Sequence, residues 1–156
     1  MKTMRKSFAM LLALVMCFTL ATSAMAAETR TVVVGDVSVT FGAEGPKVMP
    51  RGVWAFRDEC AGETNYRDSF TCYPQNGNNM DLTIDNNGSS DIIVNLTVDG
   101  ERLSAQTVSA GDSETIEFKS TDQNEGLSCD VSINMTTDDG SPMYATITAW
   151  QYQVNP

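Results

Sequence analysis

Apolar and polar residues alternate with a period of two along most of the chain after residue 27. The clearest runs are residues 37–41, 82–84, 92–98, 115–118, 129–135 and 145–149. Such alternation is typical of β-strands that bury one face and expose the other. No window of helical length after residue 27 shows a convincing period of 3.6. The pattern predicts an all-β protein.

Clusters of turn-forming residues separate these runs. Asp99-Gly100 joins residues 96–98 to residues 102–105, which is the signal of a two-residue hairpin. Further clusters of Asn, Asp, Gly, Ser and Pro lie at residues 86–90, 109–113 and 138–142. The cluster at 138–142 is expected to turn a final hairpin. Strands spaced in this way favour an antiparallel β-sandwich.

Residues 82–118 carry an ordered set of strand and turn motifs. A strand ending in Asn86-Asn87-Gly88 precedes the strand 92–98 and Asp99-Gly100, and residues 108–113 then lead into the strand 115–118. This order resembles the cell-adhesion-related, immunoglobulin-like modules of exported bacterial and archaeal proteins. The resemblance covers about a quarter of the chain and implies an immunoglobulin-like sandwich that spaces, binds or assembles, with no shared active site. The family pattern does not explain the segment before Leu82.

The first 26 residues have the pattern of a cleaved signal peptide. Three basic residues within the first six precede an apolar run, Phe8 to Leu20, and a small-x-small motif, Ala24-Met25-Ala26. The apolar run is shorter than the roughly 20 residues that span a bilayer as a helix. We therefore expect cleavage before Ala27, a single domain over residues 27–156, and a secreted, extracellular protein with no membrane insertion after cleavage.

Charge and composition narrow the classes of function. The 156 residues include 10 Lys and Arg, 20 Asp and Glu, and no His. Removing the three basic residues of the first 26 leaves 7 basic and 20 acidic residues, a net charge of −13. This acidity argues against nucleic acid, whose binding depends on cationic side chains. Without His, the commonest general base and metal ligand is missing, so we predict a protein that is not an enzyme and has no metal or cofactor.

Residues 42–81 depart from the alternating pattern. Only residues 53–57 have the character of a short strand, so we expect an irregular segment of the kind that is often functional inside a compact domain. The segment holds half of the ten aromatic residues found after residue 26, namely Trp54, Phe56, Tyr66, Phe70 and Tyr73. It also holds Lys47, Arg51, Arg57 and Arg67.

Three cysteines follow the predicted signal peptide. Cys60 and Cys72 are spaced to close a surface loop by a disulfide, as is common in exported proteins. Cys129 shares an apolar face with Val131 and Ile133, which favours a buried, reduced thiol. The alternatives join Cys129 to either of the other two across the core. Three separated thiols without His are a poor set of ligands for zinc.

Aromatic residues provide the main binding hypothesis. Tyr144, Trp150 and Tyr152 share one parity on the last strand, opposite the small apolar residues expected to face the core, and so are expected to face outward. Exposed aromatic rings of this kind stack on sugar rings. The full candidate binding set is Trp54, Phe56, Arg57, Tyr66, Arg67, Tyr73, Tyr144, Trp150 and Tyr152. Alternatively, residues 42–81 fold back and cover this aromatic face.

Three hypotheses of function follow. The first is a non-catalytic exported β-sandwich that acts by protein contact, as a surface, matrix or assembly component. The second is a carbohydrate-binding module that uses the exposed aromatic residues. The third is an enzyme inhibitor acting through the Cys60–Cys72 loop. The expected partner is a protein or a glycan at the cell surface, and free strand edges would also allow self-association.

Overall fold

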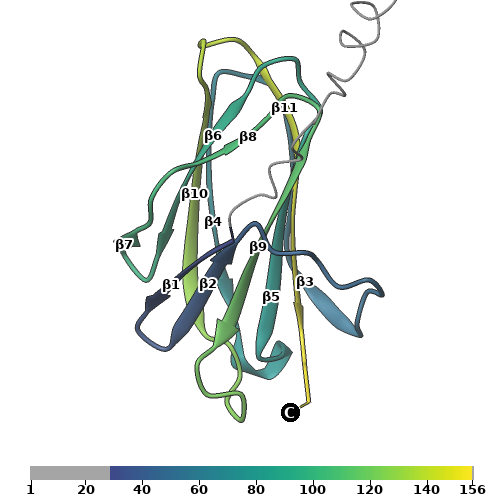
Figure 1. Cartoon of the computed structure of the whole chain (residues 1–156), viewed down its shortest axis with the longest axis vertical. Helices are drawn as coiled ribbons and strands as arrows, with labels where there is room; N and C mark the ends of the chain where they lie inside the picture. The colour runs from purple at the N-terminus through teal and green to yellow at the C-terminus, as the bar shows by residue number, and fades with distance from the viewer. Residues whose placement is uncertain (1–28, 156) are drawn as a thin grey trace, which may run out of the picture.

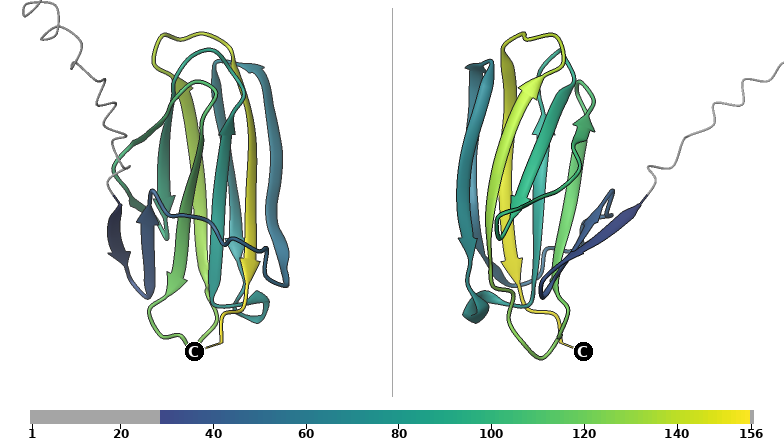
Figure 2. Two further views of the ribbon diagram at one scale, coloured as in Figure 1. Left: turned by 45° about the vertical axis from the view of Figure 1, so that its right-hand side comes forward. Right: turned by 90° about the vertical axis from the view of Figure 1, so that its left-hand side faces the viewer.

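Two antiparallel sheets pack face to face in the computed structural model, which describes residues 29–155 (Figure 1). One sheet has six strands in the order β1-β2-β9-β5-β11-β3, and the other has the order β4-β10-β6-β7, with β8 also paired to β6. Turning the molecule by 90° shows the sheets as two layers (Figure 2). The predicted all-β sandwich is therefore confirmed. The predicted signal peptide, residues 1–26, lies outside the described residues.

The eleven strands of the described residues are divided between the two sheets as follows. The six-stranded sheet contains β1 (Arg30–Val34), β2 (Val37–Phe41), β9 (Ser113–Ser120), β5 (Asn79–Asn86), β11 (Met143–Tyr152) and β3 (Gly52–Glu63). The other sheet contains β4 (Asn65–Cys72), β10 (Cys129–Thr137), β6 (Ile92–Val98), β7 (Glu101–Arg102) and β8 (Gln106–Val108). A 3-10 turn, Pro74–Asn76, connects β4 to β5.

The core fills the space between the two sheets. On most strands residues of alternating parity are buried, as the period of two predicts; on β5 and β9 they include Leu82, Ile84, Ile116 and Phe118. The β6–β7 hairpin also follows its prediction. Asp99 and Gly100 have φ angles of 49° and 83°, and positive φ at both central residues is the signature of a type I′ turn.

The strand order differs from that of an immunoglobulin-like sandwich. If β3 is numbered 1 and β7 and β8 are taken as two parts of one strand, the sheets have the orders 1-8-3-6 and 2-7-4-5, which is the double-sheet jelly roll. In an immunoglobulin sandwich the last strand lies beside the penultimate one in the same sheet. Here β10 and β11 belong to different sheets. The predicted immunoglobulin-like order and the predicted final hairpin are therefore wrong, because residues 138–142 carry the chain from one sheet to the other.

Residues 42–81 are not the irregular insertion that we expected. They contain β3, β4, the 3-10 turn and the start of β5. The alternation of β3 is hidden because Trp150 pairs with Trp54 while Ala149 pairs with Phe56, which leaves Ala55 as an extra residue in the edge strand. The longest stretch without a strand is residues 42–51, and this strap crosses the outer face of the six-stranded sheet from β2 to β3 (Figure 2).

The three described cysteines are all buried free thiols. Cys60 lies on β3 near the turn at residue 64, whereas Cys72 ends β4 in the other sheet, opposite Cys129 of β10. The expected Cys60–Cys72 disulfide is therefore not found, and strands replace the projecting loop that the inhibitor hypothesis requires. Cys129 is buried with its apolar neighbours, as its parity predicts.

Buried amide side chains fasten the connections at both ends of the sandwich. At one end the Asn86 Nδ2 donates hydrogen bonds to the carbonyl oxygens of Ser90, Val108 and Ser109 at 2.9, 3.0 and 3.1 Å. At the other end the fully buried Gln151 bonds to the segments around the 3-10 turn and before β10. These amides satisfy backbone groups that no strand partner reaches.

No helix in residues 29–155 is long and apolar enough to cross a membrane.

Candidate functional site

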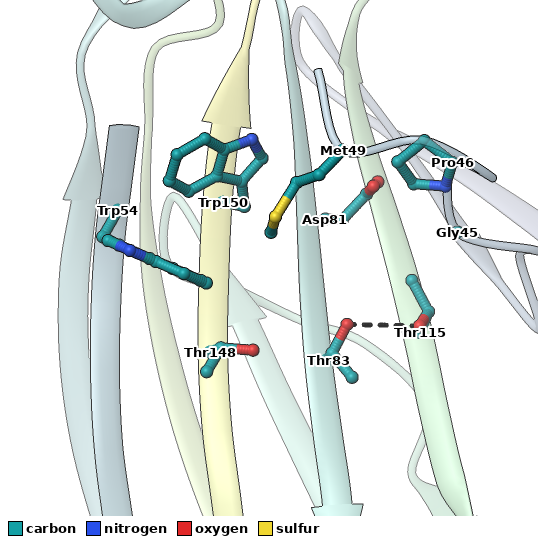
Figure 3. Close-up of a pocket in the computed structure, with 9 residues that line it drawn as sticks. All are labelled: Gly45, Pro46, Met49, Trp54, Asp81, Thr83, Thr115, Thr148 and Trp150. Atoms are coloured by element: carbon teal, nitrogen blue, oxygen red, sulfur yellow. Dashed lines mark hydrogen bonds between the residues drawn. The ribbon is translucent and has the colours of Figure 1, made fainter. Parts of the chain in front are cut away.

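A cleft opens on the outer face of the six-stranded sheet, beside the strap of residues 42–51 (Figure 3). Its volume is about 240 Å³. Its walls combine two tryptophans, a thioether, three threonine hydroxyls and one carboxyl group. We call it the tryptophan cleft; its lining residues are Gly45, Pro46, Met49, Trp54, Asp81, Thr83, Thr115, Thr148 and Trp150.

Strand register builds the floor of the tryptophan cleft. Trp54 on β3 is opposite Trp150 on β11, and Trp150 is opposite Asp81 on β5, so these three residues form one row across the sheet. Thr148, Thr83 and Thr115 form the next row, across β11, β5 and β9. Residues two apart on a strand point to the same face, so both rows point outward.

The two tryptophans pack edge to face, and one ring is left open. Their ring centroids lie 4.7 Å apart with the planes inclined at 70°. The Trp150 Nε1–H donates to the Pro50 carbonyl oxygen at 3.1 Å, which holds that ring under the end of the strap. Trp54 is 48% exposed, and the Arg57 guanidinium carbon lies 6.0 Å from its ring centroid. Trp54 therefore presents an apolar aromatic surface next to a cation.

The strap of residues 42–51 covers the face only in part. It begins with a hydrogen bond from the Ala43 N–H to the Thr115 carbonyl oxygen at 3.2 Å. Val48 and Met49 within it are exposed, and in Figure 3 the Met49 side chain reaches toward Trp150. The strap thus forms one wall of the tryptophan cleft and leaves Trp54 accessible.

Asp81 supplies the carboxyl group of the cleft. Only 8% of Asp81 is exposed, and the Tyr152 hydroxyl donates to its two oxygens at 3.3 and 3.2 Å. Burial raises the pKa of Asp81 to about 6, and nearby Glu117 adds to the rise, although the Tyr152 hydrogen bond and Lys119 oppose it. At neutral pH the group is a carboxylate that accepts hydrogen bonds.

Threonine hydroxyls supply the remaining polar groups. Thr83 and Thr115 lie on neighbouring strands with their hydroxyl oxygens 3.2 Å apart, and they share a hydrogen bond (Figure 3). Each hydroxyl is able both to donate and to accept. The cleft therefore offers donors and acceptors close to an apolar aromatic surface, an arrangement suited to binding a ligand that is itself apolar on one face and polar at its edge.

Of the nine predicted binding residues, the structure brings Trp54, Trp150 and Arg57 together. Tyr152, predicted to face outward with Trp150, is buried, with its hydroxyl on Asp81. Tyr144 is exposed but lies near the other end of β11. The three aromatic residues of the last strand therefore do not form one exposed platform.

The remaining predicted residues lie elsewhere. Phe56 faces the interior and stacks on Phe70 with ring centroids 5.1 Å apart. Tyr66 is buried and donates a hydrogen bond to Asp58 at 2.8 Å. Tyr73 is exposed just after β4, and Arg67 is exposed on β4 in the other sheet. These four residues do not contribute to the tryptophan cleft.

Sequence reasoning missed the polar floor of the cleft. Asp81 and Thr83 have the outward parity of β5, and Thr115 and Thr148 have that of their own strands. Parity alone could have placed these residues on an outer face. It could not show that β5, β9 and β11 are neighbours, which is what gathers them beside Trp150.

Within residues 29–155, no group of three or more Cys, Asp and Glu residues is arranged to hold a metal ion. No protein-family model, curated protein or solved structure matches the chain.

Proposed function

We propose that the protein is an exported, non-catalytic binding module and that the tryptophan cleft binds a neutral carbohydrate. One observation carries the proposal: the open ring of Trp54 lies against Trp150, in the row next to threonine hydroxyls and beside the Asp81 carboxylate. A sugar ring has an apolar C–H face and a polar rim of hydroxyls. Its face would stack on Trp54, and its hydroxyls would exchange hydrogen bonds with the threonines and Asp81.

The volume of the cleft and the net charge of the protein narrow the class of ligand. Its volume of about 240 Å³ is below the roughly 300 Å³ at which pockets for drug-sized ligands begin. The cleft therefore suits one ring of a longer chain that continues along the surface. The chain carries a formal net charge of −10, which repels acidic glycans, so a neutral polysaccharide is the expected class. Double-sheet jelly rolls include lectin domains, and this fold-level analogy is consistent with the proposal.

A second candidate function, protein contact, is favoured by the apolar residues around the cleft. Val48, Met49 and Val53 are exposed and lie close in sequence to Trp54. The two candidates predict different ligands for one surface, so the same variants separate them.

Binding to an array of neutral polysaccharides, followed by titration calorimetry, tests the proposal. We expect Trp54→Ala to weaken binding about tenfold or more, because stacking and buried ring area are lost. Tyr144→Ala is the matched control, since Tyr144 is 50% exposed on β11 but lies away from the cleft, and it should bind like the parent. The far-ultraviolet circular dichroism of both variants should match that of the parent.

Two outcomes would contradict carbohydrate binding. One is an array on which no neutral glycan binds the folded protein; the other is equal loss in Trp54→Ala and Tyr144→Ala. Sedimentation velocity then tests protein contact between copies of the chain. In that case the parent would associate at micromolar concentration and Trp54→Ala would remain monomeric.

A further inference from the structure

Cys72 and Cys129 face each other on adjacent antiparallel strands. They are direct partners in the register of β4 and β10, and their exposed fractions are 0% and 5%. Directly opposed residues of antiparallel strands have Cα atoms about 4.5–5.5 Å apart. Disulfides join residues whose Cα atoms are about 4.4–6.8 Å apart. The register therefore suits a bond between these two cysteines without movement of the backbone.

We propose that Cys72 and Cys129 form a disulfide and that Cys60 stays reduced. The oxidant is a second disulfide, carried by a molecule that the chain meets on export. The bond joins two strands within one sheet. It therefore differs both from a staple of the β3–β4 connection and from a link between the two sheets.

The surroundings of Cys60 argue against a disulfide with Cys72 or with Cys129. Cys60 lies on β3 opposite Ala145 of β11, in the six-stranded sheet. Its thiol donates a hydrogen bond to the Glu63 carboxylate at 3.2 Å. Burial and this carboxylate raise the pKa of Cys60 to about 11. The position of Cys60 in the opposite sheet, with no cysteine as its strand partner, is what separates it from the Cys72–Cys129 pair.

Disulfide formation balances as two exchange steps. The thiolate of one cysteine attacks the disulfide of the oxidant, which gives a mixed disulfide and releases one thiolate of the oxidant. The thiolate of the second cysteine then attacks the sulfur of the first, forms the Cys72–Cys129 bond and releases the second thiolate. The two protein thiols lose two electrons and two protons, and the disulfide of the oxidant takes them up and is reduced to two thiol groups.

Burial sets the order of folding and oxidation. The pKa of Cys129 is raised by the adjacent Cys72 thiol and by burial, so its thiolate is scarce once the sheets have packed. Exchange is therefore expected before β10 docks fully on β4. After docking, the same burial protects the bond from reductants.

The bond would stiffen the end of the sandwich next to the tryptophan cleft. Cys72 immediately precedes Tyr73, and Cys129 closely follows Leu127. The carbonyl oxygens of Tyr73 and Leu127 both accept hydrogen bonds from Gln151, the residue after Trp150. A covalent link at this point holds both segments in register.

Tryptic mapping without reduction tests the pairing directly. The full chain is refolded in a buffer of reduced and oxidised glutathione, denatured, and alkylated before digestion. Cleavage after Arg57, Arg67, Arg102 and Lys119 places Cys60, Cys72 and Cys129 in separate peptides, 58–67, 68–102 and 120–156. Cys17, if retained, lies in peptide 7–30.

We expect peptide 68–102 linked to peptide 120–156, with a loss of two hydrogens, and peptide 58–67 fully alkylated. A link that involves peptide 58–67 would overturn the proposal, and so would alkylation of all three cysteines. The readout is a covalent mass, so it is independent of whether the cleft binds a glycan.

Cysteine variants give a second, thermodynamic test. Cys72→Ala and Cys129→Ala should each lower the melting temperature of the oxidised protein by on the order of 10 °C. The double variant should have about the same melting temperature as each single variant, because either change alone removes the bond. Cys60→Ala is the matched control and should keep the linked peptides. If the Cys72 and Cys129 variants fail to fold, the peptide map of the parent still decides the pairing.

Discussion

The amide of Gln151 provides the sharpest test of the packing. Gln151 is fully buried. Its Nε2 donates to the carbonyl oxygens of Tyr73, Gly77 and Leu127 at 2.8, 3.0 and 3.1 Å. Its Oε1 accepts from the Tyr73 N–H at 3.3 Å. One side chain thus joins β11 to the 3-10 turn and to the segment that enters β10.

Gln151→Met keeps the approximate size of the side chain and removes all of these hydrogen bonds. Two of the backbone groups keep another partner, because the Tyr73 carbonyl also accepts from Asn76 and the Gly77 carbonyl also accepts from Leu127. The Tyr73 N–H and the Leu127 carbonyl lose the amide partner. Each buried polar group left without a partner costs about 1–3 kcal/mol. We therefore expect the free energy of unfolding to fall by about 4 kcal/mol.

Urea denaturation followed by tryptophan fluorescence measures this change. Gln153→Met is the matched control, since Gln153 is exposed two residues further along the chain, and it should shift stability by less than about 0.5 kcal/mol. The slope of free energy against urea should be the same in all three proteins, since they expose the same surface on unfolding.

Gln151→Glu tests the direction in which stability changes with pH. It places a carboxyl group among three carbonyl oxygens, which favours the neutral acid and raises its pKa in the folded state. The stability of this variant should therefore fall as pH rises through that raised pKa, whereas the Gln151→Met deficit should be nearly constant with pH. A Gln151→Met protein within about 0.5 kcal/mol of the parent would refute the reasoning.

Two further predictions concern Asp81 in the cleft and Gly77 in the connection between the 3-10 turn and β5. The pKa of Asp81 is raised from 3.8 to about 6, so its protonated form favours the fold: this stability is fully present below about pH 3.8 and is lost as pH rises through about 6. The free energy of unfolding should be measured for the parent and for Asp81→Asn at several pH values between 4 and 8. As pH falls toward 4, the parent should gain stability relative to the variant; parallel profiles would contradict this. Gly77→Ala should destabilise strongly, because φ is 131° and a Cβ would lie 2.1 Å from the Tyr152 carbonyl. Gly111→Ala, with φ of 78° and open space around it, should cost only about 1 kcal/mol in thermal unfolding, and equal losses would argue against the close contact.

Alternation of apolar and polar residues predicted which faces are buried, because a strand with one face in the core must follow a period of two. Leu82, Ile84, Ile116 and Phe118 are all buried as that period requires. Trp150 was placed on the outer face for the same reason. Trp54 came from the aromatic composition of its segment, since the extra residue Ala55 obscures its parity.

The pairing of strands could not be predicted in this way. The same inward residues on β11 would be buried beside β10, as in an immunoglobulin-like order, or between β5 and β3, as observed. The core pattern is nearly the same in both cases, so hydrophobic periodicity cannot choose between them. The cleft depends on this choice, because only the observed order brings Trp150 next to Trp54 and Asp81.

The position of β11 has a consequence for how the chain folds. β11 is the last strand along the chain, yet it lies between β5 and β3 inside the six-stranded sheet. Until residues 143–152 are available, β3 has no neighbour in its own sheet, and the pairings of β11 with β3 and β5 close loops of many residues. Closing such loops is slow because chain entropy is lost before contacts are gained. The sandwich is therefore expected to complete only after residues 143–152 have been synthesised.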